Sequence, residues 1–349
     1  MFHPLRIAGI SRETDDCVSL AFIIPDPLRP LFAFKPGQYL TLRATLDGHE
    51  TRRCYSICSI PGDPELRVAV KHVDGGIFSG HVNTALQAGD VIDVLPPDGR
   101  FIAEAAGGTS LGIAAGSGIT PILSLLRSTL ETRDDTRFVL LYGSRGTASI
   151  IFRTRLEDLK DRYLGRLSVF HVLSREQLDV PILSGRLDRT RITALLRAAV
   201  APADIRQAFL CGPGDLVDTA AASLAALGVP AQRVLSERFT PSSPPRPRPP
   251  VPDAAPVFAT ATIIHDGKTN LVPLAENEPI LDAAIRAGLD LPWSCRGGMC
   301  STCRARLTTG RAAMAVNFSL EPWETDAGFI LTCQASATTA HVTVDYDAL

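Results

Sequence analysis

A proline-rich segment in the last third of the chain limits what the chain can fold into. Residues 241–256 read PSSPPRPRPPVPDAAP, and eight of these sixteen positions are proline. Proline has no backbone N–H, so this segment cannot supply the hydrogen bonds of a helix or an inner strand. We expect a polyproline-II spacer at about 3.1 Å per residue, at most roughly 50 Å long; a rigid arm packed on one domain is the alternative. The 349 residues therefore divide into separate domains.

The charge changes across this segment. Residues 258–349 hold six Lys/Arg against ten Asp/Glu, a net charge of −4, whereas residues 1–257 hold 29 against 27, a net charge of +2. Such a balanced total argues against a nucleic-acid-binding protein, because that affinity rests on Lys/Arg contacts to phosphates. Apolar residues make up 45% of the chain and charged residues 21%, which is typical of folded domains.

No membrane span or export signal is expected. The most apolar stretch, residues 111–126, is interrupted by glycine, serine, threonine and proline, and it is too short and too polar to cross a bilayer. The N-terminus lacks an apolar signal core. We therefore expect a cytoplasmic protein.

Residues 1–240 change their pattern near residue 104. Up to that point short β-rich runs alternate with Pro/Gly turns, which predicts an antiparallel β-barrel over 1–104. Over 105–240 strands and helices alternate, which predicts a parallel α/β sheet. The expected strands are 110–115, 138–142, 167–172 and 207–211, and the expected helices are 121–130, 151–160, 191–199 and 216–227.

The last part of the chain, residues 258–349, reads as a small α+β domain after a linker over 241–257. Strand-like runs at 258–265 and 269–273 precede a helix at 280–287. A cysteine-rich loop and further strands at 304–307 and 342–345 follow. The fold class is thus multidomain: a barrel, an α/β domain and a β-grasp-like α+β domain.

Four of the eight cysteines fall within the last 55 residues. Cys295, Cys300 and Cys303 have C-x4-C-x2-C spacing, and 29 residues separate Cys303 from Cys333. This is the spacing of plant-type [2Fe–2S] ligands. The glycines of the intervening Arg296-Gly297-Gly298-Met299 let backbone N–H groups point toward an anionic cluster. The alternative, a structural Zn(Cys)4 site, usually shows two close cysteine pairs instead.

Two motifs in the barrel region suit a ligand that carries phosphate and a flat aromatic ring. In Arg53-Cys54-Tyr55-Ser56, arginine offers a fork for phosphate, tyrosine a flat face for a ring, and serine a small hydroxyl. Downstream, Gly75-Gly76-Ile77-Phe78-Ser79 can open a helix whose N–H groups bind a pyrophosphate. Each motif alone is also compatible with ordinary packing.

Further motifs follow expected strands of the α/β region, where such folds bind ligands. Gly116-Ser117-Gly118-Ile119-Thr120-Pro121 lies between a strand and a helix, and proline suits the first helical turn. Ser144 and Arg145 can hold a 2′-phosphate, which favours NADPH over NADH; an ordinary surface pair is the alternative. Cys211-Gly212-Pro213-Gly214 ends another strand, where Cys211 borders a nicotinamide or is simply buried.

The order of these motifs carries a resemblance. Residues 1–240 resemble the ferredoxin–NADP⁺ reductase superfamily, and residues 258–349 resemble a plant-type ferredoxin. This arrangement is similar to that of reductase components of bacterial oxygenases. Sequences at residues 52–58, 114–121, 317–322 and 331–334 are similar to those of phenylacetyl-CoA epoxidase reductase subunits.

The resemblance implies which residues hold the cofactors. For the flavin they are Arg53, Cys54, Tyr55, Ser56, Val70, Lys71, His72, Gly76, Ser79, Glu237 and Phe239. For the nicotinamide nucleotide they are Gly116, Gly118, Thr120, Pro121, Ser144, Arg145, Cys211, Gly212 and Pro213. Ser56 and Cys211 would be catalytic. FAD is expected because the G-G-x-x-S stretch matches FAD-type relatives, although similar modular reductases use FMN and no residue excludes it.

The implied function is a relay from NADPH to a one-electron acceptor. A nicotinamide delivers a hydride and an Fe–S cluster takes single electrons, so a flavin must stand between them. The implied partner is a di-iron oxygenase complex acting on phenylacetyl-CoA. The same architecture also serves ring-hydroxylating oxygenases or hybrid-cluster proteins, and a non-enzymatic zinc or redox-sensing module is the alternative from another class.

Overall fold

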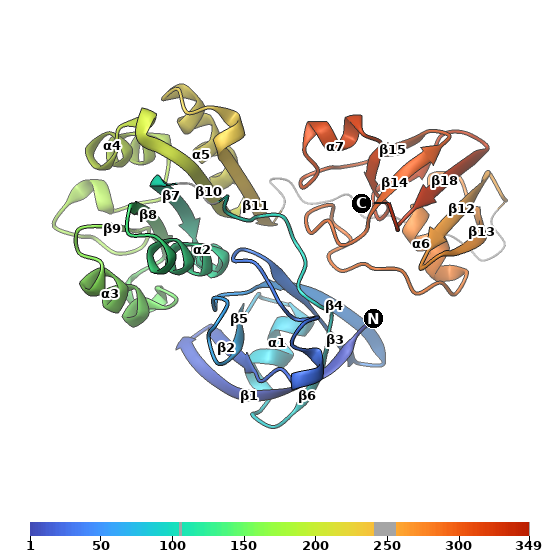
Figure 1. Cartoon of the computed structure of the whole chain (residues 1–349), viewed down its shortest axis with the longest axis horizontal. Coiled ribbons are helices and arrows are strands. Elements are labelled where there is room, and N and C mark those ends of the chain that lie inside the picture. The colour runs from blue at the N-terminus through green and yellow to red at the C-terminus, as the bar shows by residue number, and fades with distance from the viewer. Residues whose placement is uncertain (105–106, 241–255, 349) are drawn as a thin grey trace. The chain divides into compact units, whose positions relative to one another are not determined.

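The computed structural model describes residues 1–104, 107–240 and 256–348 (Figure 1). The expected polyproline spacer at 241–256 falls almost wholly outside the described residues. Contacts divide the chain into two compact units, Met1–Ser242 and Ser243–Leu349. Each unit is described by itself.

The N-terminal half of the first unit is the expected antiparallel barrel. Its elements are β1 (His3–Thr14), β2 (Cys17–Phe22), β3 (Tyr39–Leu46), β4 (His49–Ser56), β5 (Leu66–Lys71), α1 (Ile77–Thr84) and β6 (Val91–Val94). The strand order is β4-β3-β6-β1-β2-β5, and a bridge from Ile57 to Val68 joins the end of β4 to β5. Alternate residues point inward, and Leu40, Leu42, Val68 and Val70 share one apolar core.

A parallel sheet fills the other half of this unit, as the strand–helix alternation predicts. Its strands are β7 (Gly108–Ala115), β8 (Thr136–Ser144), β9 (Leu167–Leu173), β10 (Ile205–Pro213) and β11 (Val234–Thr240). The order β11-β10-β7-β8-β9 means that the chain changes direction across the sheet between β7 and β10. Ligands of open α/β sheets bind at the carboxyl ends of strands at such a switch point.

Helices cover both faces of this sheet (Figure 1). They are α2 (Ile119–Thr132), α3 (Arg153–Arg162), α4 (Arg189–Ala199) and α5 (Gly214–Ala226). Apolar residues of α2 and α3 join one core, and those of α4 and α5 join another across the sheet. Some bounds differ from those expected: α3 begins two residues later, after Phe152 with φ +61°, whereas α2 and α4 each begin two residues earlier. Strand β11 was not predicted.

The barrel packs on the α2 side of the sheet. Barrel residue Phe101 joins the core that contains α2. Arg127 of α2 makes a two-pronged ion pair with Asp63 of the barrel, with N–O distances of 2.6 and 3.0 Å. Ser124 Oγ donates to the carbonyl of Ser59 at 2.6 Å. These contacts fix the barrel and the α/β domain as one body.

The second unit is a small α+β domain. Its elements are β12 (Ala259–His265), β13 (Lys268–Leu274), α6 (Ile280–Arg286), β14 (Arg304–Thr309), β15 (Ala312–Met314), α7 (Pro322–Asp326), β16 (Phe329–Leu331), β17 (Ala335–Ala337) and β18 (His341–Asp345). The main sheet has the order β13-β12-β18-β14-β16, with β12 and β18 parallel. Apolar residues of α6 pack on this sheet. The three-part fold expected from the sequence is confirmed.

A buried ion pair holds α7 to the sheet of the second unit. Glu324 is fully buried, and its Oε1 accepts from Nε of Arg304 at 2.9 Å. Its Oε2 accepts from the backbone N–H of Glu321 at 3.0 Å, which caps the helix. Arg304 also lies over the ring of Phe329, 3.4 Å from its centroid. The segment before α7 is thereby fixed beside the cysteine-rich loop.

Candidate functional site

The four clustered cysteines come from two places in the second unit. Cys295, Cys300 and Cys303 lie on the loop between α6 and β14, and Cys333 follows β16. Sulfur hydrogen bonds join Cys295 to Cys300 and Cys303 to Cys333. The sulfurs thus form two pairs. A [2Fe–2S] cluster takes two ligands on each iron, so the donor set fits it.

Hydrogen-bond donors surround these sulfurs. The backbone N–H of Gly297 donates to Cys295 Sγ at 3.3 Å, and Thr302 Oγ1 donates to Cys300 Sγ at 3.2 Å. Gln334 Nε2 approaches Cys333 Sγ at 3.7 Å. Such donors stabilise a negatively charged cluster and tune its potential. Sequence reasoning missed Thr302 and Gln334 as donors.

The ligand loop wraps tightly and is held from outside. Arg296, Gly298 and Ser301 have φ of +50°, +75° and +57°. A Cβ on Gly298 would stand 3.2 Å from Val316 and Gln334 atoms, in addition to the strain of its left-handed backbone. The carbonyl of Gly298 accepts hydrogen bonds from the backbone N–H of Phe318 at 3.1 Å and from Ser319 Oγ at 3.3 Å.

A second group of predicted residues meets where the barrel faces the switch point of the parallel sheet. Ser56 ends β4, Cys211 lies near the end of β10, and Glu237 stands opposite Cys211 on β11. Ser56 Oγ donates to Glu237 Oε2 at 3.2 Å, and Cys211 Sγ lies 3.8 Å from the same oxygen. One carboxylate oxygen therefore joins both residues that the sequence marks as catalytic.

The surroundings of Glu237 bring its titration near neutrality. Desolvation raises the pKa of Glu237 to about 7, although hydrogen bonds from Ser56 and Cys211 act to lower it. Burial and the neighbouring Glu237 raise the pKa of Cys211 well above its ordinary value, so it stays a thiol. The carboxyl group of Glu237 therefore changes its protonation state near neutral pH.

The glycine-rich turn approaches this group closely. Gly116–Gly118 form a 3-10 turn between β7 and α2. A Cβ on Gly118 would stand only 2.2 Å from the carbonyl oxygen of Cys211, so no side chain fits there. Tyr142 Oη donates to the carbonyl of Gly116 at 2.9 Å. The backbone of the turn and that of the end of β10 thus lie in direct contact, at the edge of the sheet where a ligand is expected to bind.

Several residues predicted to contact a ligand also make contacts within the protein. Thr120 is 2% exposed, and its Oγ1 donates to the carbonyl of Ser117 at 2.9 Å; Pro121 is buried in α2. Ser79 Oγ accepts from Val73 N–H at 3.1 Å and donates to the Gly76 carbonyl at 3.2 Å. The Val70 side chain is fully buried in the barrel core.

The structure also shows the surroundings of the Arg53-Cys54-Tyr55-Ser56 motif and of the other two cysteines in the barrel, Cys17 and Cys58. Arg53 is exposed on β4, and the ring of Tyr55 lies 5.9 Å from that of Phe78, centroid to centroid. Cys54 Sγ and Thr41 Oγ1 are 3.4 Å apart. Burial raises the pKa of Cys17 and Cys58 to about 12, which marks both as core residues.

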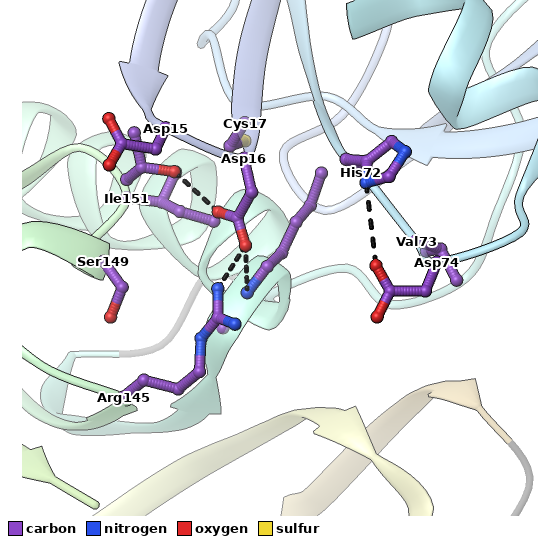
Figure 2. Close-up of polar contacts among 12 residues, drawn as sticks. Asp15, Asp16, Cys17, His72, Val73, Asp74, Arg145, Ser149 and Ile151 are labelled. Carbon is purple, nitrogen blue, oxygen red and sulfur yellow. Dashed lines mark hydrogen bonds and ion pairs between the residues drawn. The ribbon is translucent and has the colours of Figure 1, made fainter. Parts of the chain in front are cut away.

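Ser144 and Arg145 separate in the structure. Ser144 is buried at the end of β8, whereas Arg145 reaches across to Asp16 on the turn between β1 and β2 (Figure 2). Lys71 Nζ lies 3.7 Å from the same carboxylate. A cavity of about 390 Å³ opens beside these groups. Sequence reasoning missed Asp16, which belongs to no motif.

Family models agree with this division of the chain. The oxidoreductase FAD-binding domain matches residues 4–102, and the oxidoreductase NAD-binding domain matches residues 113–222. The 2Fe-2S iron-sulfur cluster binding domain matches residues 263–338.

Two relatives match over nearly the whole chain. A component of the 1,2-phenylacetyl-CoA epoxidase of Escherichia coli is 42% identical over 99% of this chain and 98% of its own length. This chain belongs to the ferredoxin–NADP⁺ reductase superfamily, in the branch with a C-terminal [2Fe–2S] domain. The ferredoxin reductase component of 3-ketosteroid-9-alpha-monooxygenase from Rhodococcus rhodochrous is 34% identical over 98% of this reductase and 96% of that protein.

Solved structures show the same fold. Phthalate dioxygenase reductase covers 99% of this reductase and 98% of its own chain, with 23% identity and a TM-score of 0.62. A type IV self-sufficient cytochrome P450 monooxygenase matches 98% of this reductase with 20% identity and a TM-score of 0.73; the match spans 41% of that longer chain. In the part of the reductase that the structure describes, every helix is too short or too polar to cross a membrane.

These findings establish the protein as an oxidoreductase, the reductase component of a multicomponent oxygenase. Its cofactors are FAD, a nicotinamide nucleotide and a [2Fe–2S] cluster, as expected from the sequence. Electrons pass through the FAD and the cluster. The roles of individual site residues stay predictions.

Thr302 offers a test of the donors around the cluster. Replacing Thr302 by Ala removes the hydroxyl that donates to Cys300 Sγ. We expect a lower cluster reduction potential, by roughly 40 mV if the lost bond favours the reduced state by about 1 kcal/mol. Potentiometric titration followed by electron paramagnetic resonance measures it. Thr302→Ser should restore the potential, and an unchanged potential in Thr302→Ala would contradict the assigned role.

Glu237 is predicted to lie beside the flavin, and its titration offers a test of this prediction. Ionised Glu237 disfavours added electrons nearby, so flavin reduction should draw a proton onto it as the pH rises above about 7. We expect the flavin midpoint potential to fall with pH more steeply in the wild type than in Glu237→Gln, by up to about 30 mV per pH unit. Spectroelectrochemical titration measures both.

Ser56 provides the matched control for this test. Its hydrogen bond lowers the pKa of Glu237, so Ser56→Ala should move the steep part of the wild-type curve to higher pH. Parallel curves for the wild type and Glu237→Gln would show that Glu237 does not titrate with flavin reduction.

Proposed function

We propose that this reductase carries electrons from NADPH through FAD and [2Fe–2S] to a di-iron oxygenase that epoxidises phenylacetyl-CoA. The supporting observation is the 42% identity to a component of a phenylacetyl-CoA epoxidase, continuous over 99% of the chain. The 34% identity to a 3-ketosteroid monooxygenase component favours a reductase of the same architecture with another acceptor as the second candidate.

The geometry at the switch point supports hydride transfer between two flat rings. When bound, FAD takes a hydride from the nicotinamide and releases electrons singly. Ser56 and Cys211 approach one Glu237 oxygen from the barrel and from β10, which fixes their orientation. Gly118 lets the turn lie directly against the backbone at the end of β10 beside Cys211. These residues orient the reactants and exclude water from between them.

The exposed cations support binding of the nucleotide phosphates. Arg53 is exposed at the start of the Arg53-Cys54-Tyr55-Ser56 motif, and Gly76 precedes the first turn of α1. A Cβ on Gly76 would stand 2.6 Å from Ser79 Oγ, so the loop needs glycine to place its N–H groups at the helix start. Arg145 supplies the guanidinium for the 2′-phosphate of NADPH.

The charge of the second unit supports docking to a partner protein. Residues 258–349 carry a net charge of −4. Such a charge steers association with a basic surface on the oxygenase. A cytoplasmic location belongs to the same proposal, since NADPH is supplied inside the cell.

The central test is turnover with the partner. The purified reductase with NADPH and the di-iron oxygenase of a phenylacetyl-CoA epoxidase should convert phenylacetyl-CoA to its epoxide, detected by mass spectrometry. A Cys333→Ser variant should still reduce ferricyanide from its flavin but should not support epoxidation. Support of a 3-ketosteroid oxygenase but not of the epoxidase would favour the second candidate.

Arg145 tests the choice of coenzyme. Arg145→Ala removes a charge-assisted contact worth about 1.5–3 kcal/mol, so kcat/KM for NADPH should fall roughly ten- to hundredfold. The value for NADH should change by less than about threefold, because NADH lacks the 2′-phosphate. Steady-state ferricyanide reduction with each coenzyme measures this. Equal losses would show that Arg145 does not contact the 2′-phosphate.

A further inference from the structure

The carboxylate of Asp16 forms ion pairs with two cations that line the cavity of about 390 Å³, Arg145 and Lys71. Its Oδ2 contacts Nη2 of Arg145 and lies 3.7 Å from Nζ of Lys71 (Figure 2). Its Oδ1 accepts from Thr14 Oγ1 at 2.9 Å. The barrel thus supplies an anion to the arginine that the α/β domain offers to a ligand.

The backbone holds both partners in place. The carbonyl of Asp16 accepts from the backbone N–H of His72 at 2.7 Å, and the carbonyl of Arg145 accepts from that of Arg175 at 2.7 Å. The side chain of Arg145 is 47% exposed and that of Asp16 28%. A ligand can therefore separate the pair by rotating the arginine side chain, without moving either domain.

While Asp16 stays paired with Arg145, the charges around the two residues disfavour binding of a phosphate. Among the residues lining the cavity of about 390 Å³, Lys71 and Arg145 are cations, whereas Asp15, Asp16 and Asp74 are carboxylates. Burial opposes ionisation of Asp16, but the Thr14 hydrogen bond and the charges of Lys71 and Arg145 lower its pKa below the ordinary value. Asp16 is therefore charged at neutral pH and competes with a phosphate that is itself nearly dianionic.

We propose that Asp16 is a coenzyme-selecting residue: its carboxylate occupies Arg145, so NADPH must displace it while NADH leaves the pair closed. The inference rests on the proposed NADPH site. Arg145 favours NADPH and Asp16 limits that preference. The balance between the two coenzymes is thus set partly by the flavin-binding barrel, not by the nucleotide-binding domain alone.

Asp16→Asn tests this in the holoenzyme. The change keeps the shape of the side chain and removes its charge. We expect kcat/KM for NADPH to rise about three- to fivefold, as for loss of a competing ion pair worth up to about 1 kcal/mol. The value for NADH should stay within twofold. The dissociation constant of 2′,5′-ADP, measured by calorimetry, should fall by a similar factor, while that of 5′-AMP should not change.

Asp15 provides a matched control on the same turn. Figure 2 shows its carboxylate pointing away from Arg145, although it lines the same cavity. Asp15→Asn removes the same charge without releasing the guanidinium. It should leave the ratio of NADPH to NADH efficiency unchanged. An equal rise of that ratio in both variants would show that removing any negative charge from this turn has the same effect. That result would overturn the proposal.

The double variant separates failure of this inference from failure of the proposed function. In an Arg145→Ala background, Asp16→Asn should have no selective effect. If Arg145→Ala impairs NADPH selectively but Asp16→Asn alters neither coenzyme, or both equally, the Asp16 proposal is overturned and the NADPH site stands. If Arg145→Ala impairs both coenzymes equally, the NADPH assignment itself is overturned.

Discussion

The predicted reaction centre depends on one shared acceptor, the Oε2 atom of Glu237. It receives Ser56 from the barrel and Cys211 from the neighbouring strand. Desolvation and these two contacts act in opposite directions on the Glu237 pKa and leave it near neutrality. Neither domain alone could produce this result, because the donor on one side is 181 residues away along the chain. The packing of the barrel on the sheet therefore sets the environment and the pKa of this carboxyl group.

That packing depends on close backbone approach as well as on side-chain pairs. Gly118 allows the glycine-rich turn to touch the end of β10, and the ion pair of Arg127 with Asp63 sets how α2 lies against the barrel. A shift of α2 would move the glycine-rich turn, where the nicotinamide nucleotide is expected to bind, relative to Ser56. Misplacement of reacting groups by about 1 Å can cost a hundredfold in rate.

The sequence predicted the [2Fe–2S] domain correctly, because the information for it is local. Three of four ligands lie within nine residues, and their spacing alone indicates the metal chemistry. For Thr120 and Ser79 it did not predict the hydrogen bonds that each hydroxyl makes within its own turn. A small hydroxyl after glycines serves equally to bind phosphate or to close its own turn, and only the fold shows the second use. Strand β11 escaped notice because its partly exposed residues lack a clear alternation.

Asp16 shows a different limit of sequence reasoning. Two aspartates on a tight turn are ordinary turn residues, and Arg145 lies 129 residues further along the chain. Nothing local distinguishes Asp16 from Asp15, yet only Asp16 reaches the guanidinium in Figure 2. Strand β5 places Lys71 beside the same carboxylate. The strand that is expected to line the flavin edge therefore also contributes a charge near the proposed 2′-phosphate site. Coenzyme preference in this fold is then a property of two domains in contact, and substitutions on the barrel turn can change it without touching any nucleotide-binding motif.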